Sequence, residues 1–242
     1  MLPAVTETRM LPGDVVVADL EGTITDGETW RGVGRWLSAN GHRRDYRRFL
    51  APRLAAMPLV RAGLLPRQSF RDRWIRDLVA LLGGRTAAEI DEIAAWVVDE
   101  ELWPGRREPI LDELVDARGR GARVVVVSGT YDPVLRLFVE RIGAEGVGTP
   151  LEFSGDVFTG RLAGPVNTGA RKIERLARLI GSASVARAYG DSIADAPLLR
   201  AAGEAVAVTP DAGLARLARG QRWRIVDAAA AGAVTKRPVR PS

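Results

Sequence analysis

The sequence contains no cysteine and only one histidine. Without cysteine, the chain can form neither a disulfide bond nor a thiolate metal site. A histidine-based metal site or a Ser-His-Asp triad would have to include His42, which lies among arginines and which we interpret as a surface residue. These absences exclude the common cysteine- and histidine-based sites.

Long apolar segments are also absent. No apolar run approaches the roughly 20 residues that a membrane-spanning helix needs. The first residues, MLPAVTETRMLPGD, lack a basic region followed by an apolar stretch, so they do not resemble a signal peptide. Translation could begin at Met1 or at Met10. We expect a cytoplasmic protein without a membrane span, and the sequence does not indicate its oligomeric state.

Lysine is scarce: only Lys172 and Lys236 are lysines among 35 basic residues, and the net charge is +5. A basic surface can bind nucleic acid. An almost complete bias toward arginine is more typical of coding composition than of a selected surface, so we do not expect nucleic acid as a partner. A lysine that persists in this composition is a candidate for a specific role.

The stretch at residues 15–23 is the most informative part of the sequence. Residues 15–18 (VVVA) predict a buried strand of a parallel sheet. Asp19 and Glu21 follow at a spacing of two, and alternation along a strand would place both carboxylates on one side. Ligands of open α/β sheets bind at this end of the strands. The alternative is that Asp19 caps a helix and Glu21 is solvated.

Helical patterns occupy the next part of the chain. With 242 residues, the chain can form one large domain or a core with a smaller insertion. The sequence Thr86-Ala87-Ala88-Glu89 matches a capping box. We therefore predict a catalytic core at residues 1–26 and 105–242 and an all-helical cap at residues 27–104. The helices expected in the cap span residues 28–39, 44–57, 67–82 and 86–101.

Strands and helices alternate from residue 105 onward. This order predicts an α/β fold, with a Rossmann-like three-layer α/β/α core around a parallel sheet. Asp132-Pro133 is expected to start a helix, with Asp132 as its N-cap. The further strands are expected at 122–127, 185–189, 204–208 and 224–226, a short strand and a hairpin at 147–162, and helices at 109–119, 134–142, 171–180, 195–201 and 211–219. The Pro- and Arg-rich tail at 236–242 is expected to be disordered.

Polar residues follow the strands of this predicted sheet. Ser128-Gly129-Thr130 follows the strand VVVV, and Asp191 and Asp195 follow the strand VARAY. Lys172 opens the helix before that last strand. In a parallel sheet all of these groups, together with Asp19, would lie at one edge. Clustered carboxylates favour a hard divalent cation such as Mg²⁺, and a hydroxyl with an ammonium favours an anion.

The four motifs in this order resemble the haloacid dehalogenase superfamily of phosphohydrolases. The motifs are DxxGT, a hydrophobic strand ending in Ser-Gly, a lysine, and GDSxxD, and the resemblance covers about residues 14–208. Each motif alone is weak, but four in the right order are specific. The helical insertion between the first two motifs is similar to the branch with a helical cap, which includes phosphoserine phosphatase.

The resemblance implies a role for each motif residue. Asp19 would be the nucleophile and Glu21 the general acid and base. Mg²⁺ would be held by Asp19, Asp191 and the backbone carbonyl of Glu21. The phosphoryl group would be held by Ser128, Gly129 and Lys172, while Asp195 would orient Lys172 or a metal-bound water and Thr23 would brace the loop.

Three departures from the family pattern stand out. The second acid of the family is usually Asp, and here it is Glu21, which is one methylene longer. The phosphoserine phosphatases usually carry a second glycine where this chain has Thr130. The lysine lies three residues later than in those enzymes, so Arg171 competes with Lys172; the scarcity of lysine favours Lys172.

Two residues of the cap are candidates for recognising the rest of the substrate. Glu28 resembles the glutamate that meets the substrate ammonium in phosphoserine phosphatase, and Arg71 resembles the arginine that meets the carboxylate. The alternative is that Glu28 starts a helix and Arg71 is a surface residue. The cap is also rich in arginine and tryptophan, which would suit a larger anionic or lipid-like phosphate, although a solvated basic face is the simpler interpretation. The tryptophans are Trp30, Trp36, Trp74 and Trp96.

The leading hypothesis is a Mg²⁺-dependent phosphatase that acts through an aspartyl-phosphate intermediate. Its substrate would be a small organic phosphate ester similar to phosphoserine. A phosphoryl transferase or mutase with the same nucleophile, or a phosphatase for lipid-type phosphates, is the alternative. A relative that binds a phosphorylated ligand without turnover is disfavoured, because the catalytic residue types are intact.

Overall fold

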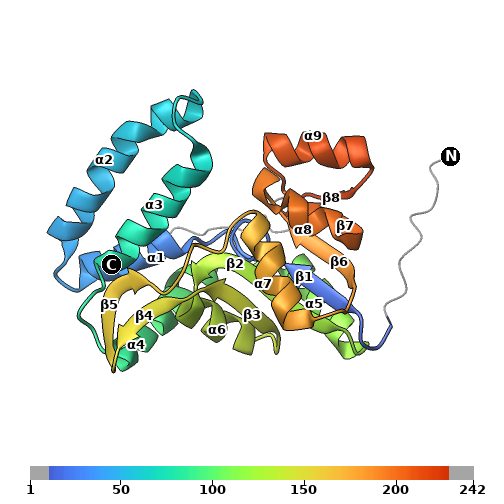
Figure 1. The fold of residues 1–242 in the computed structure, drawn as a ribbon, viewed down its shortest axis with the longest axis horizontal. Coiled ribbons are helices and arrows are strands. Elements are labelled where there is room, and N and C mark those ends of the chain that lie inside the picture. Colours follow the sequence, from blue (N-terminus) through green and yellow to red (C-terminus); the bar gives the residue numbers. More distant parts are fainter. Residues whose placement is uncertain (1–10, 229–242) are drawn as a thin grey trace, which may run out of the picture.

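The computed structural model describes residues 11–228, so the predicted tail and the two candidate start residues lie outside the described part. A six-stranded parallel sheet has the order β3-β2-β1-β6-β7-β8 (Figure 1). The predicted parallel α/β fold is thereby confirmed. The strands are β1 (Val15–Ala18), β2 (Arg123–Tyr131), β3 (Glu145–Thr149), β6 (Val185–Gly190), β7 (Ala202–Val208) and β8 (Arg224–Val226).

Helices cover both faces of this sheet. Along β1, Val16 and Ala18 belong to one hydrophobic cluster, and Val15 and Val17 belong to another. The first cluster includes helices α5 (Glu108–Gly119) and α6 (Asp132–Glu140). The second includes α7 (Ala170–Ile180), α8 (Ala196–Arg200), which follows the short η2 (Ile193–Asp195), and α9 (Ala212–Gln221). Strand alternation thus produces the predicted three layers.

Helices also fill the segment between β1 and α5. They are α1 (Thr29–Ala39), α2 (Arg43–Arg61), α3 (Arg67–Ala80), α4 (Ala87–Val97) and the π-helical η1 (Val98–Leu102). Two boundaries of these helices differ from the predictions by four residues, and the others agree to within two residues. Helix α2 continues through Pro58 instead of ending before it, and the last predicted helix changes to π-helical geometry at Val98.

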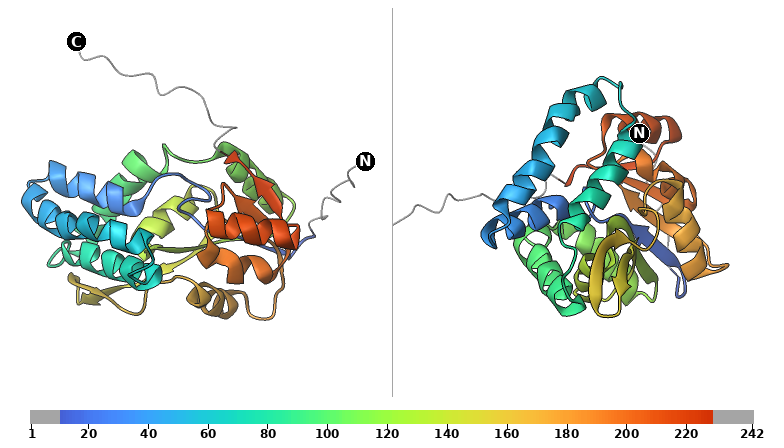
Figure 2. Two further views of the ribbon diagram at one scale, coloured as in Figure 1. Left: turned by 90° about the horizontal axis from the view of Figure 1, so that it is seen from above. Right: turned by 60° about the vertical axis from the view of Figure 1, so that its left-hand side comes forward.

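The inserted helices have two different surroundings. Helices α1 and α4 share the hydrophobic cluster of α5 and α6, and Arg136 of α6 pairs with Asp91 of α4 at 2.8 Å. Helices α2 and α3 form an antiparallel pair that projects from the rest of the molecule (Figures 1 and 2). The projecting pair is therefore the part of the insertion that stands over the sheet edge.

A β-hairpin supports the insertion from the other side. The predicted hairpin forms from β4 (Leu151–Ser154) and β5 (Val157–Leu162). Its backbone binds the turn between α3 and α4: the N–H of Phe158 donates to the carbonyl of Arg85 at 2.7 Å, and the N–H of Gly84 donates to the carbonyl of Phe158 at 2.8 Å. Phe158 is fully buried. The core thus anchors the base of the projecting helices.

Local signals in the sequence had mixed outcomes. The predicted capping box of Thr86 and Glu89 is present at the start of α4. Asp132 is not the N-cap of α6: β2 continues to Tyr131, which takes that place, and the Asp132 carboxylate accepts from the N–H of Gly148 at 2.9 Å. His42 has a side chain that is 44% exposed and stacks on Trp36.

Within residues 11–228, no helix has the length and apolarity to span a membrane.

Candidate active site

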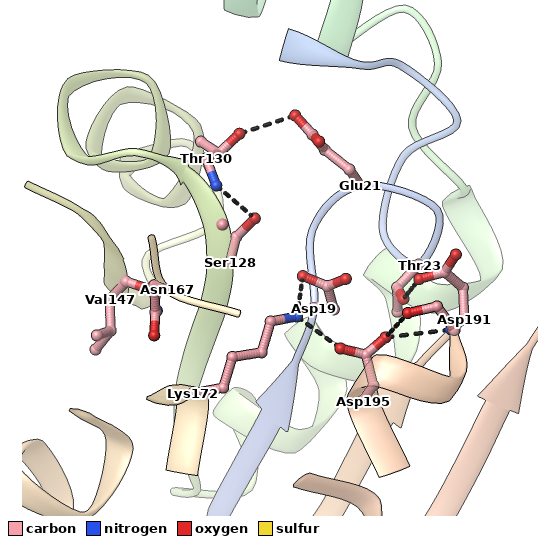
Figure 3. Close-up of polar contacts among 12 residues, drawn as sticks. Asp19, Glu21, Thr23, Ser128, Thr130, Val147, Asn167, Lys172, Asp191 and Asp195 are labelled. Atoms are coloured by element: carbon pink, nitrogen blue, oxygen red, sulfur yellow. Dashed lines mark hydrogen bonds and ion pairs between the residues drawn. The ribbon is translucent and has the colours of Figure 1, made fainter. Parts of the chain in front are cut away.

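The ends of three neighbouring strands bring the predicted site residues together. Asp19 follows β1, and its N–H donates to the carbonyl of Tyr189 in β6 at 3.0 Å. Asp191 follows β6, and Ser128 lies near the end of β2, on the other side of β1. Figure 3 shows that Asp19 lies between Ser128 and Asp191. Adjacent parallel strands thus place two acids and a hydroxyl at one sheet edge.

Three carboxylates form a compact cluster at this edge. One oxygen each of Asp19, Asp191 and Asp195 lies within 4.8 Å of the others. Burial, as the largest cause, raises the pKa of Asp19 to about 6 and that of Asp191 to about 8. The neighbouring carboxylates raise both values further, and Lys172 opposes the rise. Such a cluster of oxygen donors fits a hard divalent cation that would offset the repulsion.

Lys172 links two of these carboxylates. Its ammonium Nζ lies 2.8 Å from Asp19 Oδ1 and 2.6 Å from Asp195 Oδ1, and the residue is 3% exposed. Burial alone would lower the lysine pKa, but the two carboxylates raise it, so the side chain stays charged. The competing residue, Arg171, is 43% exposed and lies 3.8 Å from Asp72 of α3. Lys172 therefore reaches the cluster, while Arg171 points to the projecting helices.

Asp195 is held in place by local hydrogen bonds. Its Oδ2 accepts from the Ser192 hydroxyl at 2.8 Å and from the Ser192 N–H at 3.2 Å. Burial would raise its pKa, but Lys172 and these hydrogen bonds lower it. Both oxygens of Asp195 are thus engaged, which leaves Asp19 and Asp191 as the better candidates for metal ligands, with Asp195 orienting Lys172.

The loop after β1 packs tightly against Asp191. Gly22 has a φ of +87°, and a Cβ there would lie 2.2 Å from Asp191 Oδ2. The Thr23 hydroxyl donates to Asp191 Oδ1 at 3.4 Å. Arg107, which sequence reasoning missed, donates from Nη1 to the carbonyl of Gly22, and its N–H donates to the carbonyl of Ile24 at 2.7 Å. Only glycine can occupy position 22 beside the acid cluster.

Glu21 is positioned by two donors from separate elements. Its Oε1 accepts from the N–H of Thr29, the first residue of α1, and from the Thr130 hydroxyl of β2, both at 2.8 Å. The two threonine hydroxyls lie 2.6 Å apart. Sequence reasoning singled out Thr130 only as a departure from the family pattern. The longer Glu21 side chain explains how the carboxylate reaches it (Figure 3).

A second layer supports the backbone around Ser128. Ser128 is 2% exposed, and its Oγ accepts from the N–H of Thr130 at 3.2 Å. The Thr149 hydroxyl donates to the carbonyl of Gly129 at 2.8 Å and accepts from the N–H of Asn167 at 3.0 Å. Asn167 in turn donates from Nδ2 to the carbonyl of Val147 at 2.8 Å. Thr149 and Asn167, which the sequence did not single out, therefore fix the Gly129 peptide.

This arrangement agrees with comparisons to known proteins. Residues 16–200 match the haloacid dehalogenase-like hydrolase family. The chain is 31% identical over 233 residues to a protein of Mycobacterium tuberculosis named phosphoserine phosphatase SerB1, covering 90% of this chain and 73% of the relative. The chain belongs to the haloacid dehalogenase-like hydrolase family.

Solved structures of low sequence identity share the fold of this haloacid dehalogenase-like hydrolase. A Bordetella pertussis protein of unknown function superposes with a TM-score of 0.74 at 20% identity, covering 90% of this chain and 99% of that one. A substrate-bound phosphoserine phosphatase gives a TM-score of 0.59 at 18% identity, covering 88% of this chain and 92% of that one. These likenesses confirm the fold class.

The acid cluster of the hydrolase opens into a cavity of about 670 Å³ beneath the projecting helices. Asp19, Asp191, Ser128 and Lys172 line its floor. The predicted substrate-recognition residues also line the cavity: they are Glu28, Arg71 and Gly129. The site is therefore a polar floor under a lid that belongs to the helical insertion.

Proposed function

We propose that this hydrolase is a Mg²⁺-dependent phosphomonoesterase that works through an aspartyl-phosphate on Asp19. The observation that carries the proposal is the position of the Asp19 carboxylate, which lies at the cavity floor between the Lys172 ammonium and Asp191. A nucleophilic carboxylate needs such a setting, since a dianionic phosphate approaches it only where positive charge offsets the repulsion. The family membership and the relative named phosphoserine phosphatase support the same chemistry.

The first step transfers the phosphoryl group to the enzyme. An Asp19 carboxylate oxygen forms a bond to phosphorus while the bond from phosphorus to the ester oxygen breaks. Glu21 gives its proton to the departing oxygen, which leaves as a neutral alcohol. Because Oε1 of Glu21 accepts the hydrogen bonds from Thr29 and Thr130, Oε2 is the oxygen that exchanges this proton.

The second step releases phosphate. Glu21 takes a proton from a water molecule, whose oxygen forms a bond to phosphorus while the bond from phosphorus to Asp19 breaks. Ser128 and Lys172 hold the phosphoryl oxygens, and Asp195 keeps the ammonium aimed at them. Mg²⁺ bound by Asp19, Asp191 and the Glu21 carbonyl would offset the charge of the phosphoryl oxygens and the carboxylates.

The helical insertion acts as the cap in this proposal. The core comprises residues 1–26 and 105–242, and the cap comprises residues 27–104. The projecting pair α2 and α3 supplies the upper wall of the cavity. Glu28 and Arg71 also line this cavity, and the resemblance to phosphoserine phosphatase makes an amino-acid phosphate one candidate substrate.

The proposal is tested with the purified protein, Mg²⁺ and p-nitrophenyl phosphate. Asp19→Asn should lower kcat/KM by roughly a thousandfold or more, since it removes the nucleophile. Asp14→Asn, at the opposite end of β1, is the matched control and should keep full activity. Acid quenching with radiolabelled substrate should trap label on the wild type only. Undiminished turnover by Asp19→Asn would refute the proposal.

A further inference from the structure

The cavity wall above the acid cluster is made of apolar side chains. These side chains come from both projecting helices and from the segments beneath them. They are Trp30 of α1, Leu54 and Met57 of α2, Phe70, Trp74, Ile75 and Leu78 of α3, and Tyr131. An organic group attached to a phosphate on the floor would extend into this wall.

Much of this apolar surface is open to solvent. Leu54 is 54% exposed, and Phe70, Trp74 and Ile75 are partly exposed. The ring of Trp74 makes edge contacts with Trp30 at 5.4 Å and with Phe70 at 5.8 Å between centroids. An exposed aromatic and aliphatic surface in a cavity of about 670 Å³ is typical of a site that buries an apolar ligand.

The charged wall residues are poorly placed to select an amino acid. The Glu28 carboxylate already accepts from the indole N–H of Trp30 and lies 3.8 Å from the guanidinium of Arg31. Both contacts fall on Oε2, so a substrate ammonium at Oε1 would share the charge of the Glu28 carboxylate with Trp30 and Arg31. Arg71 also lines the cavity, but it is an exposed residue, so its guanidinium is solvated rather than held toward a substrate carboxylate. The apolar residues thus form the surroundings of the organic group.

We propose that this hydrolase selects phosphate monoesters whose organic group is apolar, aliphatic or aromatic, in preference to phosphorylated amino acids. The inference rests on the proposed phosphatase function and specifies its substrate class. The floor binds the phosphate. Contact of the organic group with the wall of α2 and α3 increases the affinity for the ester in proportion to the apolar area that becomes buried.

A series of n-alkyl phosphates from ethyl to hexyl tests this inference. These esters have leaving groups of nearly equal basicity, so a change in kcat/KM reports contact with the wall and not the ease of bond cleavage. Each methylene that is buried should raise kcat/KM by about fourfold, until the chain fills the cavity. A flat series would overturn the inference.

A pair of branched substrates tests selection directly. Isobutyl phosphate has the shape of O-phospho-L-serine with methyl groups in place of the ammonium and the carboxylate. The inference predicts that isobutyl phosphate has a kcat/KM at least about tenfold higher, from two buried methyl groups. Chemistry alone would favour phosphoserine, because its leaving group is the weaker base. A preference for phosphoserine would therefore overturn the inference.

Two leucines of α2 provide matched variants. Leu54 lines the cavity, whereas Leu59 is similarly exposed, at 46% against 54%, and lies outside the lining. Leu54→Asn should flatten the dependence of kcat/KM on the length of the alkyl chain. Leu59→Asn should leave the series unchanged. If the two variants changed the dependence on chain length equally, the cavity wall would not contact the alkyl chain of the substrate.

The outcomes separate the two proposals. If no ester is hydrolysed in the presence of Mg²⁺, including ethyl phosphate and phosphoserine, the proposed phosphatase function fails. If esters are hydrolysed through Asp19 but the series is flat or phosphoserine is preferred, only the substrate class is wrong.

Discussion

At the scale of single residues, the contact between Glu21 and Thr130 makes the clearest prediction. The Thr130 hydroxyl donates to Glu21 Oε1 at 2.8 Å, and the residue is 4% exposed. Thr130→Val keeps the shape but removes this donor, so the carboxylate is no longer fixed toward the leaving group. We expect kcat/KM for butyl phosphate, whose alkoxide needs a proton, to fall by about 10- to 100-fold. The loss of kcat/KM for p-nitrophenyl phosphate should be smaller, because its leaving group, p-nitrophenolate, departs without taking up a proton.

Thr130→Ser is the control for this prediction, because it keeps the hydroxyl and loses only a methyl group. It should restore most of the activity on butyl phosphate. The comparison uses kcat/KM, which reports the step that includes departure of the alcohol. Equal losses on the two substrates, or failure of serine to restore activity, would assign Thr130 a structural role only.

The same contact marks what sequence reasoning could find in the site. Asp19, Asp191 and Lys172 were found because each follows or precedes a recognisable element, and parallel strands necessarily bring those positions to one edge. Thr130 and Arg107 were not found as partners of the first loop, because they lie 109 and 85 residues away from the groups they bind. No local pattern encodes where such side chains point.

At the scale of elements, one network joins α5 to β8 and to β6, the strand that precedes Asp191. Glu113 of α5 accepts from the Tyr189 hydroxyl of β6 at 2.7 Å and from Arg224 Nη1 of β8 at 2.9 Å. Burial would raise the pKa of Glu113, but the hydrogen bonds and charges of these partners lower it. The carboxylate therefore stabilises the fold when it is ionised.

Glu113→Gln should lower the free energy of unfolding near pH 7 by about 1–2 kcal/mol, because a buried charge-assisted contact is lost. A carboxyl group whose pKa is lowered in the folded state contributes its full stabilisation at pH values above its pKa in the unfolded state. That contribution is lost as the pH falls through the folded value. The free energies of unfolding of wild type and variant, measured in urea, should thus differ most above about pH 5, and the difference should shrink as the pH falls below the unfolded pKa of about 4.3.

Glu108→Gln is the control on the same helix, since the Glu108 side chain is 59% exposed and pairs with Arg106 at the surface. Its effect should stay within about 0.5 kcal/mol at every pH. If the difference in the free energy of unfolding between wild type and Glu113→Gln persisted unchanged in acid, packing and not the charge of Glu113 would be its cause.

The elements themselves were largely predictable. The apolar run VVVA and the helix signal of Thr86 and Glu89 are local, and local patterns specify secondary structure. The π-helical geometry at Val98 was not foreseen, nor was the binding of Phe158 to the turn at Arg85. Both features depend on contacts with distant segments. Sequence periodicity gives the elements, while their docking depends on tertiary packing.

At the scale of the whole molecule, the helical insertion is joined to the segments before and after it by two chain crossings that bind each other. The N–H of Arg107 donates to the carbonyl of Ile24 at 2.7 Å, and the N–H of Asp26 donates to the carbonyl of Gly105 at 2.9 Å. Thr25 also donates to the carbonyl of Leu102 at 2.5 Å. Paired crossings next to the acid cluster couple the position of the cap to the loop of Glu21.

The acid cluster affects the stability of the whole molecule. Lys172 pairs with Asp19 and Asp195 but not with Asp191, so the mutual repulsion of the three carboxylates is offset only in part. A divalent cation that binds only the folded state stabilises it by about 2.7 kcal/mol at 100 times its Kd. For a chain of this length we expect Mg²⁺ to raise the Tm by about 5 to 10 °C over the protein in EDTA. Scanning calorimetry at matched ionic strength measures this shift.

Asp191→Asn separates cation binding from a general effect of salt. The variant removes one repelling carboxylate, so its Tm in EDTA should equal or exceed that of the wild type, and Mg²⁺ should no longer raise it. Asp116→Asn, at a side chain that is 75% exposed on α5, should keep the full shift. If Mg²⁺ stabilised Asp191→Asn as much as the wild type, the cation would bind elsewhere. Because one carboxylate both repels its neighbours and binds the cation, the cost of assembling the site and its affinity for Mg²⁺ have the same origin.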